Sequence, residues 1–338
     1  MANDMYKKII VPVDNSSYSN YCTDIAIALA KQFGSELTGS HVYSASLHDK
    51  RFRDMEVGLP GHYQEEERLQ KSRKIHDTLI GSGLRMISDA YLDSFKKRCQ
   101  ASDVSFTCSI TEGKNWSELV KEVRKNDYDL VVLGILGLGA VNGNLIGSVC
   151  ERVVRKVAAD VLVVKNDKPL EGRIVVAIDG SPDSFAAFRK ALDLTKRFGL
   201  AIEAVSVYDP YFHRRAFQAL VGVLSDEAGK MFRFKEQERM HDEIIDDGLG
   251  KIYRGHLDEA VRMGHDKGID VKSTLLAGKA YHEIEKYLEQ QPPSLLVVSR
   301  FGAHKTDEQD IGNTTENLLR LAPCNLLITG ASSRTDPV

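Results

Sequence analysis

The chain has 338 residues, enough for about two domains of ordinary size, and 42% of them are hydrophobic, as in packed globular cores. The formal net charge is only −3, with basic residues scattered among acidic ones, so we expect no nucleic acid partner. The N-terminus lacks the pattern of a secretory signal, and the longest apolar run, 130–141, is too short to span a membrane. We therefore expect a cytoplasmic protein without a membrane partner.

The predicted elements of the first half alternate between strands and helices. The strands are expected at 8–14, 37–43, 104–110, 130–133 and 161–165, and helices at 18–33, 116–125 and 145–157. The strands are nearly continuous apolar runs, which suits burial on both faces of a sheet. This pattern predicts a doubly wound α/β domain with a five-stranded parallel sheet.

The connection between the second and third strands, 44–102, is longer than a crossover helix needs. Its second part, 63–98, has the apolar spacing of a long amphipathic helix, and 232–263 repeats this pattern. Each domain is therefore expected to carry a long helical insertion, which we call the arm. Because its apolar stripe is too long for one small sheet to cover, we expect the arms to pack with one another or with a second molecule.

A repeat with a constant offset of 165 residues runs through the chain. The segment Ile-Val-Pro-Val-Asp-Asn-Ser at 10–16 returns as Val-Val-Ala-Ile-Asp-Gly-Ser at 175–181, and later landmarks keep the same offset. The polar segment 166–172 contains Pro and Gly, as linkers do. We therefore expect two domains, 1–168 and 169–338, that pack as an intrachain pseudo-dimer, with a homodimer as a further possibility.

A glycine-rich pattern follows the fourth strand. After Gly134 and Gly137 come nine residues and then Gly147 and Ser148, at the start of a helix. Glycines let the backbone approach a ligand, and helix-start N–H groups with a hydroxyl favour phosphate. If the first and fourth strands are neighbours, Asp14 faces this loop across the crevice where open parallel sheets bind ligands. Adenine has an exocyclic amine that could donate a hydrogen bond to Asp14. The alternative is that the glycines only shape a turn.

The spacing G-x2-G-x9-G-[ST], with an aspartate closing a V-P-V-D strand, resembles the nucleotide-binding pattern of the universal stress protein family. The resemblance covers nearly the whole chain as a tandem pair, and it implies the strand order 3-2-1-4-5. It also implies that the first domain binds ATP, or ADP or AMP, with or without Mg²⁺. Asp14 and the Val42 backbone would contact adenine, and the glycines with Ser148 would contact ribose and phosphates. The implied binding residues are Pro12, Val13, Asp14, Val42, Gly134, Gly137, Gly147, Ser148 and Val149.

The second copy departs from this pattern. Ser299 stands where Gly134 does, and Asn313 replaces Ser148. The loop between them carries three acids, Asp307, Glu308 and Asp310, which would repel a triphosphate. We expect this second site to be degenerate, although Asp179 could still hold an adenine.

Other residues allow more than one interpretation. Lys114 and its counterpart Lys279 follow the third strand of each copy, but the Walker A spacing is missing and a helix start explains the segment equally well. His76 and His241, each followed by aspartate, could bind metal or shuttle protons, yet a role in the arm interface is favoured. The five cysteines are widely spaced without a CxxC pair, so we expect structural thiols and no metal centre.

The favoured function is an adenine-nucleotide-binding stress or signalling protein whose bound ATP tunes its conformation or its choice of an unknown protein partner. A slow ATP hydrolase is the second interpretation, but no general base or water-positioning residue can be assigned, so catalysis is not supported. The third is a nucleotide-free scaffold that acts through its arms.

Overall fold

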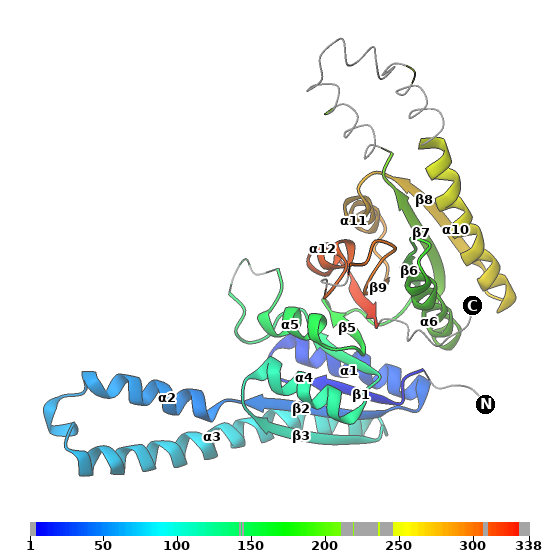
Figure 1. Cartoon of the computed structure of the whole chain (residues 1–338). Helices are drawn as coiled ribbons and strands as arrows, with labels where there is room; N and C mark the ends of the chain where they lie inside the picture. Colours follow the sequence, from blue (N-terminus) through cyan, green and yellow to red (C-terminus); the bar gives the residue numbers. More distant parts are fainter. Residues whose placement is uncertain are drawn as a thin grey trace. The chain divides into compact units, whose positions relative to one another are not determined.

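The computed structural model describes residues 5–141, 143, 145–210, 219, 236, 246–306 and 310–330. The chain divides into two compact units, Met1–Asp167 and Lys168–Val338. Figure 1 shows that each unit is a sheet with helices packed on its faces. Among the described helices, none combines the length and the apolar character that a membrane crossing requires.

The first unit is a five-stranded parallel sheet. Its strands are β1 (Lys8–Pro12), β2 (Glu36–Tyr43), β3 (Phe106–Glu112), β4 (Leu130–Gly134) and β5 (Asp160–Val164). Its helices are α1 (Ser17–Phe33), α2 (Ala45–Met55), α3 (Glu66–Ala101), α4 (Asn115–Asn126) and α5 (Ser148–Lys156), with short 3-10 turns at Glu56–Gly58 and Gly61–Tyr63. The strand order is β3-β2-β1-β4-β5, and each neighbouring pair is parallel. The predicted order 3-2-1-4-5 is confirmed, and β1 lies beside β4.

Local sequence signals set the limits of α1. The Ser16 side chain caps its start by accepting the Ser19 N–H, and Gly34 ends it in the left-handed conformation, with φ of 69°. Because strand order runs outward in both directions from β1, right-handed crossovers place α1 and α3 on one face and α4 and α5 on the other. The contacts agree, since α1 packs on α3, and α4 packs on α5.

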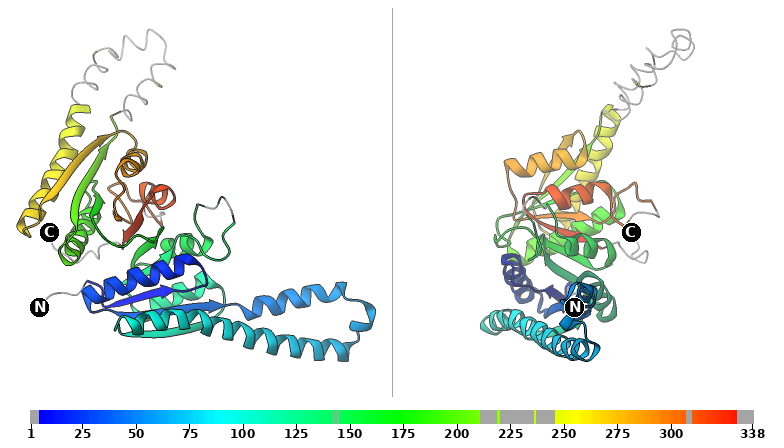
Figure 2. Two further views of the ribbon diagram at one scale, coloured as in Figure 1. Left: turned by 180° about the vertical axis from the view of Figure 1, so that it is seen from behind. Right: turned by 90° about the vertical axis from the view of Figure 1, so that its left-hand side faces the viewer.

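The arm of the first unit consists of α2 and the N-terminal part of α3, which run side by side away from the sheet (Figures 1 and 2). The C-terminal part of α3 instead buries Leu92, Phe95 and Cys99 against the domain. Contacts within the arm include the stacked rings of His76 and Phe52, with centroids 4.1 Å apart, and the ion pair of Arg73 Nη2 with Glu56 Oε2 at 2.6 Å. His76 thus serves the packing of the arm.

The second unit repeats the first. Its strands are β6 (Arg173–Ala177), β7 (Ala201–Tyr208), β8 (Val271–Ala277), β9 (Leu295–Ser299) and β10 (Asn325–Thr329). Its described helices are α6 (Pro182–Phe198), α10 (Asp246–Asp266), α11 (Ala280–Gln290) and α12 (Asn313–Leu321). The order is β8-β7-β6-β9-β10, again parallel. The end of its expected arm helix, 232–263, forms part of α10, whereas 232–235 and 237–245, including His241, lie outside the described residues.

The second sheet contains a buried carboxylate, Glu203, in β7. Its side chain is only 1% exposed and pairs with Arg173. Thr274 and Tyr287 each donate a hydroxyl to Glu203 Oε1 at 2.6 Å, and Lys272 lies 3.1 Å from the same oxygen. Burial by itself raises the pKa of Glu203, but the hydrogen bonds from Thr274, Tyr287 and Lys272, together with Arg173, outweigh it and hold the pKa below its usual 4.5.

The protein is therefore expected to become less stable at acid pH, as Glu203 becomes protonated. Because its folded-state pKa lies below the unfolded value, its contribution is complete above pH 4.5 and is lost as the pH falls through the folded-state pKa. Glu203→Gln should lower the unfolding free energy at pH 7 by about 3 kcal/mol, since it leaves the Arg173 charge uncompensated. Urea unfolding between pH 3 and 7 measures both effects; a variant whose acid sensitivity equals that of the parent would contradict this assignment.

Candidate functional site

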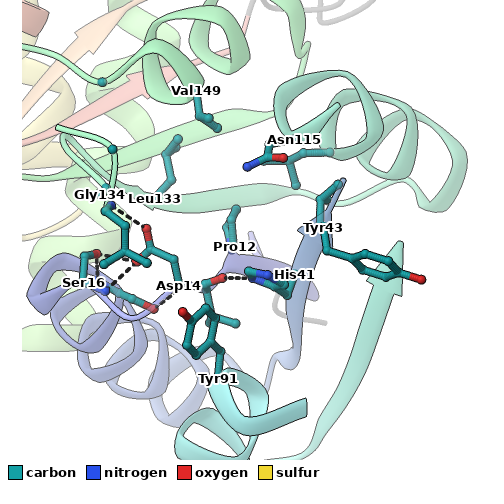
Figure 3. A pocket seen from close by; sticks show the side chains of 18 of the residues that line it. Pro12, Asp14, Ser16, His41, Tyr43, Tyr91, Asn115, Leu133, Gly134 and Val149 are labelled. Atoms are coloured by element: carbon teal, nitrogen blue, oxygen red, sulfur yellow. Dashed lines mark hydrogen bonds between the residues drawn. The ribbon is translucent and has the colours of Figure 1, made fainter. Parts of the chain in front are cut away.

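A cavity of about 640 Å³ opens at the carboxyl ends of β1, β2 and β4. Figure 3 shows Pro12, Asp14 and Gly134 meeting there from neighbouring strands. The structure brings together all nine residues that the family resemblance implied. The nine that line this cavity are Pro12, Val13, Asp14, Val42, Gly134, Gly137, Gly147, Ser148 and Val149.

The Asp14 carboxylate ties the end of β1 to the loop after β4. Its Oδ1 accepts hydrogen bonds from the Ser16 N–H at 2.9 Å and the Ser16 hydroxyl at 2.5 Å, and its Oδ2 accepts the Leu138 N–H at 3.1 Å. We call this set of contacts the aspartate clamp. Sequence reasoning missed it, because it assigned Asp14 only to a ligand.

The clamp explains why glycine stands at Gly137. A Cβ there would lie 2.8 Å from Asp14 Oδ2, and a Cβ at Gly134 would lie 2.5 Å from the Cβ of Tyr18. A side chain at Gly137 would push the loop away from Asp14, and one at Gly134 would push the end of β4 away from α1. The loop must therefore run close to Asp14, which also brings its backbone to the cavity wall.

The start of α5 supplies hydrogen-bond donors at the same end of the cavity. The Gly147 N–H is used internally, since it donates to the Ile135 carbonyl at 2.7 Å. The following residues, Ser148 and Val149, are the first of the helix, and N–H groups at helix starts have no acceptor within the helix. With the exposed Ser148 hydroxyl and the helix dipole, they form a site suited to an anion.

The opposite end of the cavity is more apolar and includes the base of the arm. His41 Nδ1 lies 2.7 Å from the Val13 carbonyl, and its ring meets Tyr91 of α3 edge-on at 5.1 Å (Figure 3). Leu47 of α2 and Ile87 of α3 line the same end. Sequence reasoning missed this wall, although the arm begins directly after Val42 and Tyr43 in the chain.

Lys114 does not line the cavity. Its ammonium group lies over the Trp116 ring, 5.4 Å from the centroid, and the helix α4 begins at Asn115. Asn115 itself does line the cavity and is drawn in Figure 3. The structure therefore places the amide of Asn115, and not the charge of Lys114, at the site.

Cys150 is a buried thiol at the edge of the cavity. Burial raises its pKa to about 12, so it stays protonated and is a poor nucleophile. Across the described residues, no group of three or more His, Cys, Asp or Glu side chains is placed to hold a metal ion. A nucleotide-bound Mg²⁺ would find one carboxylate among the cavity residues, that of Asp14.

The second unit has a smaller cavity of about 390 Å³ at the corresponding place, and it keeps the clamp. Asp179 Oδ1 accepts the Ser181 N–H at 3.0 Å and hydroxyl at 2.6 Å, and Oδ2 accepts the Ala303 N–H at 2.8 Å. Ser299, the counterpart of Gly134, donates its hydroxyl to the Phe301 carbonyl at 2.7 Å.

A basic side chain lines the second cavity. Lys305 lines it, with its ammonium group over the Phe301 ring at 4.3 Å. Of the three loop acids, Asp310 is exposed, whereas Asp307 and Glu308 lie outside the described residues. The smaller volume and the serine at position 299 are therefore the clearer differences between the two sites.

The two halves of the chain each match one family model. The model of the universal stress protein family matches residues 5–165 and 172–330. The chain belongs to the universal stress protein family. A universal stress protein from Methanocaldococcus jannaschii is 31% identical over 165 residues, which are 49% of this chain and 85% of that protein.

A solved universal stress protein shares the fold. It comes from Archaeoglobus fulgidus and superposes with a TM-score of 0.61 at 16% identity, covering 98% of this chain and 99% of that one. Another, from Arabidopsis thaliana with AMP bound, has a TM-score of 0.30 at 16% identity, covering 47% of this chain and 92% of that one. The likeness to the Archaeoglobus fulgidus protein therefore covers both units of this chain.

Removing the clamp should loosen the loop in either unit. Asp14→Ala leaves the Leu138 N–H and the Ser16 hydroxyl without their acceptor, which should lower the unfolding free energy by about 1–3 kcal/mol. Amide exchange at Leu138 should become faster. Asp179→Ala is the matched variant and should speed exchange at Ala303 instead. If the Leu138 amide exchanges at the parent rate in Asp14→Ala, the clamp does not hold the loop.

Proposed function

We propose that this cytoplasmic universal stress protein binds one adenine nucleotide, ATP or its diphosphate or monophosphate, in the cavity of its first unit. The observation that carries the proposal is the meeting of a glycine-lined loop, a free helix start and an apolar end in one cavity. Bound nucleotide would tune the conformation of the protein and its choice of protein partner.

The phosphates would lie at the start of α5. Ser148 and Val149 offer backbone N–H groups there, and the Ser148 hydroxyl is exposed. Asp14 is the sole acid among the cavity residues, and donors from Ser16 and Leu138 already compensate its charge. The site therefore repels an anion less than it would if the Asp14 carboxylate had no hydrogen-bond donors.

The base would lie at the other end, against β2. The Val42 backbone and the side chains of Leu47 and Ile87 line this part. A flat, weakly polar base matches such a wall, because binding pockets combine apolar surfaces with a few well-placed polar groups. The cavity volume of about 640 Å³ is within the range of small-molecule sites.

The second cavity is proposed to be empty or to hold a less charged ligand. It has about 390 Å³, and a side chain at Ser299 replaces the glycine of the first loop. Catalysis is not part of the proposal, because no side chain at the first cavity is assigned as a general base for water. A scaffold without nucleotide remains the competing function.

Two matched pairs of substitutions test the proposal. Gly137→Val should displace the loop, because even its Cβ would lie 2.8 Å from Asp14 Oδ2. Ser148→Ala removes one donor to phosphate, which corresponds to roughly 1.5–3 kcal/mol and so to an affinity about 10- to 100-fold weaker. Gly302→Val and Asn313→Ala make the equivalent changes in the second unit and should leave affinity nearly unchanged.

Titration calorimetry of the full chain with ATP, ADP and AMP provides the measurement. We expect one site per chain in the parent and in the second-unit variants. Thermal unfolding of each variant shows whether it is folded. Unchanged affinity in folded Ser148→Ala and Gly137→Val, or a halved stoichiometry in the second-unit variants, would contradict the proposal.

A further inference from the structure

The outer face of α3 exposes large apolar side chains that no other described residue of the first unit covers. Ile75, Leu79 and Met86 are 58%, 67% and 72% exposed. The opposite side of the same helix carries Leu92 and Phe95, which are buried against the domain. The exposed three therefore form a stripe that points away from their own sheet.

The stripe belongs to a regular pattern of three- and four-residue steps. The residues at these steps, which we call the outer seam, are Arg68, Ser72, Ile75, Leu79, Ser82, Met86, Asp89 and Asp93. Alternating steps of three and four are the spacing by which one helix packs along another in a coiled coil. The helix α2 contacts a different side of α3, where Phe52 meets His76 and Glu56 meets Arg73.

We propose that the arms of two copies of this chain pair antiparallel through the outer seam. In one register, Ile75 of each copy meets Met86 of the other, and Leu79 meets the small Ser82. Ser72 then faces Asp89, and Arg68 faces Asp93 at both ends. In this register apolar residues meet apolar or small ones, Asp89 meets a hydroxyl, and the charges of Arg68 and Asp93 are opposite.

Charge selects the antiparallel direction. The seam is basic at its start, with Arg68 and the adjacent Lys71, and acidic at its end, with Asp89 and Asp93. Parallel pairing would set like charges opposite each other, whereas antiparallel pairing sets opposite charges together. Arg68 and Asp93 already have exposed partners one turn away, Glu65 and Lys96, and such pairs exchange at little cost.

The centre of this register lies beside a pair of glycines. A Cβ at Gly81 or Gly83 would meet no atom of the chain within 4 Å, so the packing of this chain does not require glycine at either position. Glycine inside a helix is unfavourable relative to alanine. Gly83 flanks the seam, where a missing side chain lets a second helix approach closely.

Cysteine crosslinking in the full-length protein tests both the contact and its direction. In a Cys108→Ser background, which removes the exposed native thiol, one chain carries Ser72→Cys and another Asp89→Cys. Mixing the two and adding a short thiol crosslinker should yield a covalent dimer. Each single variant alone should yield none, because like positions would lie about 25 Å apart along the antiparallel helices.

Control variants distinguish a specific contact at the outer seam from crosslinking by random collision. Lys74→Cys lies on the same half of α3 but off the seam, so its mixture with Asp89→Cys should crosslink at least 10-fold less. Adding Leu79→Lys and Met86→Lys to the reactive pair should abolish the product while circular dichroism stays that of a folded protein. Crosslinking within each single variant would mean parallel pairing, and equal yields from the seam and control mixtures would mean no specific contact; either result overturns the proposal.

Discussion

The first site depends on one hydrogen-bonded contact, the clamp that Asp14 makes between the end of β1 and the loop after β4. The carboxylate accepts N–H groups from Ser16 and Leu138, and so it sets how closely the loop approaches the sheet. Gly137 is required by that approach, and the path of the loop then leads to the free start of α5. The geometry proposed to bind an anion is thus a consequence of a contact within the protein.

The second unit keeps the clamp but has a different cavity surface. The clamp recurs there with the same three donors, and Gly312 donates to the Arg300 carbonyl as Gly147 does to that of Ile135. What differs is the surface of the cavity, where Ser299 replaces the glycine at 134 and the volume is smaller. A duplicated domain can therefore keep its loop geometry while the surface of its cavity changes, because the clamp needs only Asp, Ser and a backbone N–H.

The sequence predicted the parallel sheet because apolar strands, capped helices and the repeat are local signals that all agree, whereas the strand order came from the resemblance to the universal stress protein family. It also predicted which residues meet at the cavity, because the carboxyl ends of neighbouring parallel strands share one edge. It did not predict that Leu47 and Ile87 of the arm line the same cavity, since that depends on how two helices leave the sheet. Nor did charge counting reveal that Lys305 lies against Phe301 in the second cavity, because such contacts join residues through folding and have no periodic signature.

The central claim is that one adenine nucleotide binds per chain, in the first unit. The most direct measurement is the quantity and identity of nucleotide released when the protein, saturated with ATP and freed of excess ligand, is denatured and analysed by mass spectrometry. The account predicts close to one adenine nucleotide per chain for the parent and for Gly302→Val, and almost none for folded Gly137→Val. No release from the parent, or equal release from both variants, would contradict it.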